Sequence, residues 1–513
     1  MAKGKVMSAD RSVRGIRPSR RAGIAAAAGC VLAAMAPATT GVAAQAYPTT
    51  ANSISRADKA EGAKAHPDLL AEFGGALTGP QASYVEQVGK TIAIQSGLSN
   101  ARGDFAVTLL NSPVNNAFAI PGGYVYVTRQ LTALMNNEAE LAGVLGHEVG
   151  HVAARHSAKR QQAASRNQLL GVLGSVLSGV LLGDSAFGRL GQQLASQGSQ
   201  MLTLKYSRSQ ELEADRLGIS YLKRAGYDPR AMATVLDSLA RQNALESQLR
   251  GSTNQVPQWA STHPDPASRV RDAQAQAGSG QSGSGQVGMT NRDVFLTRID
   301  GLVYGDDPKQ GIIDGNRFTH PDLRLAFQAP EGFYLVNGTQ AVSINGDSGK
   351  AQFSGGALGT GLDAYIQTVF ASLTQSGQAR IVPSRIERAE VNGLAAAYGV
   401  AQVQASSGPV DVAVFAYDFG GGKAYHFLTI TRVGGAGAFN GMFKSMRRIS
   451  AGEAGQVKPR RLSVVTVKAG DTVQSLAGRM AYTDAAVERF LVLNGLESGA
   501  RLVPGQKVKL VVY

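Results

Sequence analysis

The sequence predicts an α+β protein of three folded units: a mainly helical domain with a small β-sheet, an α+β middle domain, and a small C-terminal module of strand, helix, helix and strand. The chain has 513 residues, too many for one typical domain. Hydrophobic residues make up 43% and charged residues 17%, which is the composition of a globular protein rather than a disordered one. A Gly/Ser-rich stretch at residues 278–290 separates the first unit from the second as a flexible linker.

Residues 1–46 have the three parts of a secretory signal peptide. Basic residues run to Arg21, an apolar stretch follows at 22–36, and Ala44-Gln45-Ala46 provides a cleavage site. The apolar stretch is too short to span a membrane. We therefore expect an exported protein of the periplasm or cell envelope. The alternative is a lipoprotein modified at Cys30, because the residues before this cysteine resemble a lipobox.

The net charge of +14 and the pI of about 9.8 suit contact with anionic membrane surfaces, cell-wall polymer or nucleic acid. The sequence shows no zinc finger, RNA-recognition motif or basic patch interleaved with aromatic residues, so nucleic acid is not an expected partner. The basic residues are scattered, and a solvated basic surface is the simpler interpretation.

The first unit, residues 47–277, contains two predicted strands followed by a helix. The strands are expected at 105–110, which ends in Asn-Ser-Pro, and at 124–128, which is rich in aromatic and β-branched residues. Apolar residues then recur at helical spacing over 137–156.

This helix carries the motif H-E-x-x-H at residues 147–151. His147 and His151 are four residues apart, so they lie on one face of the helix, where both imidazoles can reach one zinc ion at roughly 2 Å. Zinc lowers the pKa of a bound water toward ~7. Glu148 can take the proton of that water as general base and return it to the leaving amine. The pattern is that of zinc peptidases.

A catalytic zinc needs a third protein ligand. His156 is nine residues from His147, about half a turn out of phase, so a continuous helix turns it away from the metal toward the surface or a supporting position. Farther along the chain, Glu211 and Asp215 are four residues apart on a predicted helix. One of them can ligate zinc while the other orients a ligand histidine. A solvated acidic helix face, which would include Glu213, is the alternative.

Four segments together resemble the zinc metallopeptidase family that includes the CAAX prenyl protease, HtpX and periplasmic BepA. They are Asn116–Gly123, the H-E-x-x-H run, Ser207–Asp215, and Thr262-His263-Pro264. The resemblance covers about residues 104–273 and implies a zincin (gluzincin) fold that binds one zinc ion. It also implies that Glu211 is the third ligand, that Asp215 supports a ligand histidine, and that Glu213 is a bystander.

The same resemblance implies roles for two further segments. Asn116, Ala117 and Phe118 lead into an edge strand beside the cleft, to which a peptide substrate can add as an extra strand. Simple core packing is the alternative for Phe118. His263 is expected near the metal, where it either stabilises the tetrahedral intermediate or covers the zinc when substrate is absent. The apolar run at 169–182 is expected to be a core or lid helix, with peripheral membrane contact as the alternative.

Residues 291–450 form the middle domain, an α+β unit of unknown function. Strand-like runs at 410–417 and 425–430 flank a helical stretch at 362–374. No catalytic group of residues is apparent, and His320 and His426 are expected to be structural.

The tail at 462–513 resembles a LysM domain, a small βααβ module that binds N-acetylglucosamine polymers such as peptidoglycan. Gly470-Asp471-Thr472 and Pro504-Gly505-Gln506 carry the resemblance. A packing module without a ligand is the alternative.

The sequence thus predicts a zinc-dependent endopeptidase that hydrolyses peptide bonds of proteins or peptides. By resemblance, the substrates are misfolded or stalled envelope proteins. A wall-anchored chaperone or assembly factor with an idle metal site is one alternative, which the intact Glu148 disfavours. A peptidoglycan hydrolase is another, which the LysM-like tail favours and the peptidase motifs disfavour.

Overall fold

The computed structural model describes residues 54–99, 102–157, 159, 206–250, 263, 266–278, 288–373, 381–405 and 408–513. The expected signal peptide with Cys30, the apolar run at 169–182, and Thr262 and Pro264 lie outside these residues, as does most of the expected linker. Within the described residues, no helix is both long and apolar enough to cross a membrane.

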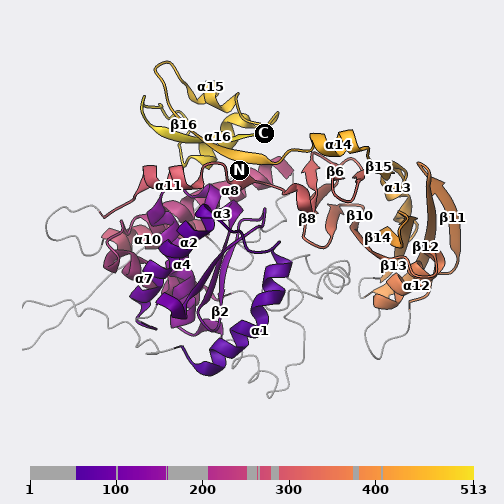
Figure 1. Ribbon diagram of the computed structural model, residues 1–513, viewed down its shortest axis with the longest axis horizontal. Helices are drawn as coiled ribbons and strands as arrows, with labels where there is room; N and C mark the ends of the chain where they lie inside the picture. The colour runs from indigo at the N-terminus through magenta and orange to yellow at the C-terminus, as the bar shows by residue number, and fades with distance from the viewer. Residues whose placement is uncertain are drawn as a thin grey trace, which may run out of the picture. The chain divides into compact units, whose positions relative to one another are not determined.

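The first unit is built around a three-stranded sheet of order β1-β3-β2. Strand β3 pairs parallel with β1 and antiparallel with β2, so β2 lies at an edge. The strands are β1 (Ala106–Leu110), β2 (Ala117–Ile120) and β3 (Tyr124–Thr128). The helices are α1 (Arg56–Glu72), α2 (Pro80–Ala93), α3 (Arg129–Leu134), α4 (Glu138–Ala153), α7 (Arg208–Arg224), α8 (Ala231–Arg250) and α10 (Pro266–Gly278) (Figure 1). Both predicted strands and the predicted helix are present.

The alternating side chains of β3 divide the core of this unit between the two faces of the sheet. Val125 and Val127 are buried with the apolar residues of α2 and α4. Tyr126 is buried on the opposite face with Leu69 and Phe73 from α1 and the end of that helix. Figure 1 shows α1 on one side of the sheet and α2 and α4 on the other. Helix α4, which carries the H-E-x-x-H motif, is thereby held beside the edge strand β2.

Glycines let α4 and α7 approach closely. A Cβ added at Gly150 would lie 3.1 Å from the carbonyl oxygen of Ala214, and one added at Gly218 would lie 3.1 Å from the backbone nitrogen of His147. Both distances are tighter than ordinary van der Waals contact, so larger residues would push the helices apart. This close packing brings the acidic residues of α7 next to the histidines of α4.

The middle unit contains two antiparallel sheets. A seven-stranded sheet has the order β11-β12-β13-β14-β10-β9-β8, and a four-stranded sheet has the order β15-β7-β6-β5. The strands are β5 (Ile312–Asp314), β6 (Arg317–His320), β7 (Leu325–Gln328), β8 (Tyr334–Asn337), β9 (Val342–Gly346), β10 (Gly349–Ala357), β11 (Ile386–Val391), β12 (Leu394–Ala405), β13 (Gly408–Asp418), β14 (Lys423–Arg432) and β15 (Arg447–Arg448). Helices α12 (Leu362–Ser372) and α13 (Asn440–Ser445) belong to the same unit, and α14 (Ala451–Gln456) follows it. The predicted helix and both predicted strands are found.

The C-terminal unit has the predicted order of strand, helix, helix and strand. Its elements are β16 (Arg460–Thr466), α15 (Val473–Ala477), α16 (Ala486–Leu493) and β17 (Lys507–Val512), with β16 and β17 antiparallel. A short strand, β4 (Val303–Tyr304), pairs with the other edge of β16.

One boundary differs from the predicted one. Helix α11 (Arg292–Ile299) and β4 fall within the range assigned to the middle domain, residues 291–450. The apolar side chains Phe295, Leu296 and Ile299 are buried in the cluster that also contains residues of α2 and α4. The predicted linker begins where α10 ends, but composition carries no information about the core into which the next helix packs.

Candidate metal centre

Four buried side chains bring one possible ligand atom each to a single point. They are His147 and His151 from α4, Glu211 from α7, and His263, and these atoms all lie within 4.8 Å of one another. Each residue is no more than 2% exposed. The three predicted zinc ligands and the predicted neighbour His263 are therefore brought together from three segments, of which the first and the last are 116 residues apart.

The spacing on α4 produces the expected geometry. The Nε2 atoms of His147 and His151 are 3.0 Å apart, and each lies 3.5 Å from a carboxylate oxygen of Glu211. Glu211 is in the first turn of α7, which begins with a capping box between Ser207 and Gln210. Two imidazoles and a carboxylate are the donor set of catalytic zinc sites.

His147 is held from behind by Asp215. Its Nδ1 lies 2.9 Å from Oδ1 of Asp215, one turn after Glu211 on α7. Burial alone would raise the pKa of Asp215, but the Arg269 guanidinium outweighs it and lowers that pKa to about 2. The carboxylate is thus charged and accepts the Nδ1 proton, which leaves the Nε2 lone pair for a metal.

Arg269, from α10, was not predicted from the sequence. This fully buried guanidinium binds Asp215 through two nitrogens, at 2.6 and 2.8 Å, and reaches Glu211 through the third, at 2.5 Å. Nothing in the local sequence distinguishes Arg269 from the exposed Arg271 two residues later. Its role depends on the packing of α10 against α7, which spacing along the chain does not reveal.

His156 is buried, not on the surface as a continuous helix would have placed it. Helix α4 ends at Ala153, and Arg155 adopts a left-handed conformation with φ 54°. This turn brings Nδ1 of His156 to 2.8 Å from Nδ1 of His151. The supporting position, the other expectation for His156, is the one observed. Nε2 of His156 lies 3.1 Å from Oε2 of Glu213. Glu213 does not belong to the group of possible ligands, but it contacts this histidine.

Glu148 and His263 face each other across the site. Nε2 of His263 lies 3.4 Å from Oε1 of Glu148, and its Nδ1 lies 3.1 Å from Oε1 of Glu211. Burial raises the pKa of Glu148, although the nearby histidines oppose this shift. Burial alone would lower the pKa of His263, but Glu211 and Glu148 outweigh it and raise that pKa. Neither carboxylate oxygen of Glu148 has a hydrogen-bond partner among the described residues. A buried carboxylate that accepts no hydrogen bond is costly and fits a group that acts on a small polar molecule.

Tyr206 contributes an aromatic wall that the sequence did not predict. Its ring stacks on His151 with centroids 3.7 Å apart and planes 17° from parallel. Tyr206 directly precedes Ser207, the N-cap of α7, so the element that supplies Glu211 also restrains the His151 ring.

The predicted substrate segment lies in and just before β2. The side chain of Phe118 packs between Phe73 and Tyr126 on the α1 face of the sheet, away from α4, in agreement with the core-packing alternative. Ala117 is buried in the other core, with the residues of α4. Asn116 is 1% exposed, and neither polar atom of its amide has a hydrogen-bond partner among the described residues.

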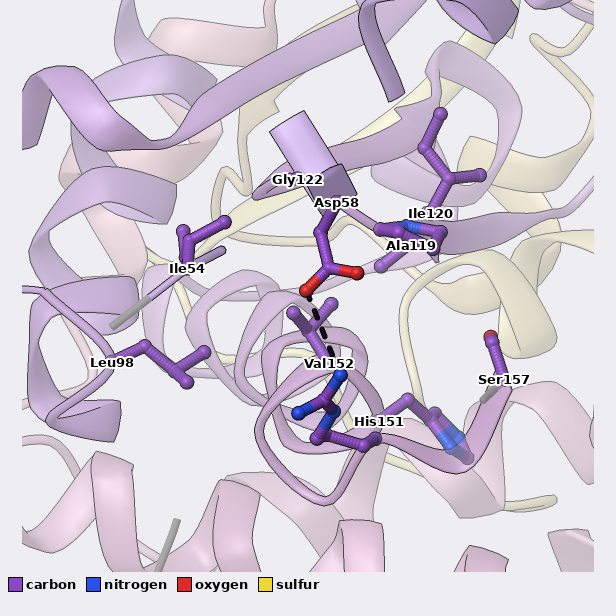
Figure 2. A pocket seen from close by; sticks show the side chains of 11 residues that line it. Ile54, Asp58, Leu98, Ala119, Ile120, Gly122, His151, Val152 and Ser157 are labelled. Atoms are coloured by element: carbon purple, nitrogen blue, oxygen red, sulfur yellow. Dashed lines mark ion pairs between the residues drawn. The ribbon is translucent and has the colours of Figure 1, made fainter. Parts of the chain in front are cut away.

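A small pocket of about 50 Å³ opens beside His151. Figure 2 shows its apolar walls, and the Asp58–Arg155 ion pair, at 4.0 Å, crosses it. The walls come from the residues before α1, the loop after α2, the end of β2 and the end of α4; the apolar side chains are Ile54, Leu98, Ala119, Ile120 and Val152. The pocket therefore adjoins both a possible metal ligand and the edge strand.

The donor set fits zinc. The outer partners of His147 and His151 contact their Nδ1 atoms, so both Nε2 lone pairs point at the same space from 3.0 Å apart. A cation between them would remove this repulsion, and imidazole with carboxylate suits zinc.

Two segments of the chain match known families. Residues 80–277 match peptidase family M48, and residues 465–511 match the LysM domain. Among curated proteins, the chain is similar to the beta-barrel assembly-enhancing proteases of Yersinia pestis, 36% identical over 38% of each chain, and of Escherichia coli strain K12, 34% identical over 42% of each. It is also similar to the mitochondrial metalloendopeptidase OMA1 of Schizosaccharomyces pombe, 32% identical over 40% of this chain and 57% of that protein.

The similar region spans only about two fifths of the length of the bacterial relatives. The segment that matches peptidase family M48, residues 80–277, contains all four residues of the metal centre. The matches confirm the two resemblances recognised in the sequence. Residues 80–277 are a peptidase family M48 domain, and residues 465–511 are a LysM domain.

Proposed function

We propose that the protein is a zinc-dependent endopeptidase that hydrolyses peptide bonds of proteins in the cell envelope. The observation that carries this proposal is the convergence of His147, His151 and Glu211 on one point, with the carboxylate of Glu148, which has no hydrogen bond among the described residues, beside them. His147, His151 and Glu211 would hold the zinc, and Asp215 positions His147.

Zinc bound there would supply a Lewis acid that makes a water molecule acidic enough to react near neutral pH. Glu148 removes the proton from the attacking water and delivers it to the leaving amine. Its burial suits this task, because a raised pKa brings a carboxylate closer to the working pH. Asp215 keeps its own charge and holds His147 in one orientation throughout.

The edge strand β2 supports an extended peptide beside the metal centre. A substrate strand can pair with β2 through backbone hydrogen bonds, as in other cases of strand addition. Asn116, whose buried amide has no partner among the described residues, would bind the substrate backbone. The pocket next to His151 would receive an apolar substrate side chain close to the bond that is cut.

His263 is proposed to cover the metal when substrate is absent. It contributes a possible ligand atom to the same group as the three ligands, and neutral imidazole is a competent zinc ligand. Its contact with Glu148 also restrains the general base. Stabilisation of the oxyanion is the second candidate role, because a histidine at this position can donate a hydrogen bond.

The LysM domain is proposed to bind peptidoglycan and so to keep the enzyme at the cell wall after export to the periplasm or envelope. Two relatives are named for enhancing beta-barrel assembly, which supports misfolded or stalled envelope proteins as substrates. Peripheral membrane contact would follow from the net charge of +14, and nucleic acid is not proposed as a partner.

The decisive experiment compares the purified protein and Glu148→Gln on an unfolded protein such as casein and on peptidoglycan, with and without a chelator. We expect the native chain to cut casein only without chelator. Glu148→Gln should retain zinc and lose this activity, because the amide cannot accept the proton. Metal-dependent release of peptidoglycan fragments with intact casein would instead support a wall hydrolase. Suppression of casein aggregation without cleavage would support a chaperone.

A further inference from the structure

His151, His156 and Glu213 form a line of side chains leading away from the metal centre. Nδ1 of His151 lies 2.8 Å from Nδ1 of His156, and Nε2 of His156 lies 3.1 Å from Oε2 of Glu213. His156 is fully buried, whereas the Glu213 side chain is 30% exposed. The line therefore runs from a possible metal ligand to the edge of solvent.

Hydrogen-bond chemistry permits one arrangement of protons along this line. Nε2 of His151 faces the metal centre, 3.5 Å from Glu211, and must be unprotonated to bind a metal. The proton of a neutral His151 is then on Nδ1, so Nδ1 of His156 must accept it. A neutral His156 then carries its own proton on Nε2, where it donates to the carboxylate of Glu213.

We propose that His156 and Glu213 are positioning residues that hold the His151 ring and fix its proton on Nδ1. They do for His151 what Asp215 does for His147, with an imidazole inserted between the ligand and the carboxylate. The inference deepens the proposed function by assigning support to the second zinc ligand.

The local backbone is shaped for this contact. Arg155 has φ 54°, in a left-handed region that residues other than glycine rarely adopt. This conformation ends α4 two residues after His151 and returns His156 beneath the ligand ring. Tyr206 stacks on the ring of His151, so the ring is restrained from both its face and its Nδ1 edge.

Two substitutions separate hydrogen bonding from packing. His156→Leu keeps an apolar side chain of similar size but has no acceptor, and we expect zinc affinity to fall by ~10–100-fold, the usual cost of losing such a partner. In His156→Asn the amide oxygen lies near the former Nδ1 position and can accept from His151, so most of the affinity should be retained. Glu213→Gln keeps an acceptor and should lose less affinity than Glu213→Leu.

The measurements are zinc affinity, by competition with a chromophoric chelator, and the histidine tautomers of the zinc-free full chain. The chain has seven histidines, few enough for long-range ¹H–¹⁵N spectra of ¹⁵N-histidine-labelled protein. We expect His151 protonated on Nδ1 and His156 on Nε2. A proton on Nε2 of His151, or equal affinity in His156→Leu and the unsubstituted chain, would overturn the inference. Equal losses in His156→Leu and His156→Asn would reduce His156 to packing and also overturn it.

These outcomes are separate from those of the proposed function, because the tautomers are read without zinc and the affinities without proteolysis. The predicted tautomers and affinities in a protein that leaves casein intact would refute the endopeptidase proposal and support the positioning role.

Discussion

Arg269 places one guanidinium nitrogen 2.5 Å from the carboxylate of Glu211 while its other two nitrogens bind Asp215. One buried cation thereby joins a proposed zinc ligand to the residue that orients another. The two carboxylates and the guanidinium are all at most 1% exposed, so little water is available to replace any of them. The three charges stabilise one another only as a set.

Arg269→Met should therefore destabilise the peptidase domain. Removing one partner from a buried charged set typically costs ~3–5 kcal/mol, because the remaining charges are left uncompensated. The midpoint of thermal unfolding of the domain and its zinc affinity should both fall. The matched control is Arg271→Met on the same helix, since Arg271 is exposed. Equal midpoints for the two variants would show that the buried set does not stabilise the domain.

Glu211→Ala should lose bound zinc, whereas Glu213→Ala should still fill with one zinc per chain when zinc is in excess. Glu211 lies 3.5 Å from a ring nitrogen of each ligand histidine. Glu213 lies 3.1 Å from His156, which does not belong to the group of possible ligands. Metal content after gel filtration in zinc-containing buffer distinguishes the two. Zinc lost from Glu213→Ala but kept in Glu211→Ala would mean that the assignment of the third ligand is reversed.

Filling the pocket beside His151 should change which bonds are cut. Val152→Phe reduces the space for a substrate side chain, so cleavage next to large apolar residues should decline in favour of small ones. Val152→Ala should shift the preference in the opposite direction. Mass spectrometry of casein fragments gives both profiles, with Val336→Phe on the exposed face of β8 as control. Identical cleavage profiles for all three variants would show that the pocket does not take part in substrate recognition.

His426 should make the middle domain sensitive to acid. The side chain is buried between Tyr365 and Ser354, and burial lowers its pKa to about 4 from an ordinary value of 6.5. Between these two values the unfolded chain binds a proton that the folded chain does not, so stability is full above pH ~6.5 and falls as the pH drops toward 4. The loss in the free energy of unfolding is at most ~3 kcal/mol, because each unit of difference between the folded and unfolded pKa contributes about 1.36 kcal/mol.

Hydrogen exchange of the β14 amides between pH 4 and 7, corrected for intrinsic exchange rates, reports this stability. His426→Gln cannot titrate and should flatten the dependence. An equally steep loss of protection in His426→Gln would assign the acid sensitivity to other groups.

The sequence predicted the features that depend on spacing within one helix and missed those that depend on packing between helices. Four-residue spacing was enough to place His147 and His151 together. It left Glu211 and Asp215 equivalent, because both lie on one face of α7, and only the family resemblance separated them. Arg269 carried no local signal. The two positions expected for His156, at the surface or in support of a ligand, could not be separated from the sequence, because no glycine marks the left-handed turn at Arg155 that follows the end of the helix.

His263→Ala is the most informative substitution at the metal centre. His263 lies 3.1 Å from Glu211 and 3.4 Å from Glu148, so in this arrangement it occupies the space where substrate and water must react. It is 1% exposed, and we expect the histidine to withdraw when a peptide binds. If covering the metal is its main role, the alanine variant should cut casein faster than the unsubstituted chain, because the closed state is no longer favoured. If it instead stabilises the oxyanion, turnover should fall by ~100-fold, the usual cost of losing one such donor. We expect the increase, because its possible ligand atom lies within 4.8 Å of those of the three proposed ligands. Turnover at saturating substrate and zinc affinity, measured together, separate the two roles, and a variant unchanged in both would exclude His263 from the site.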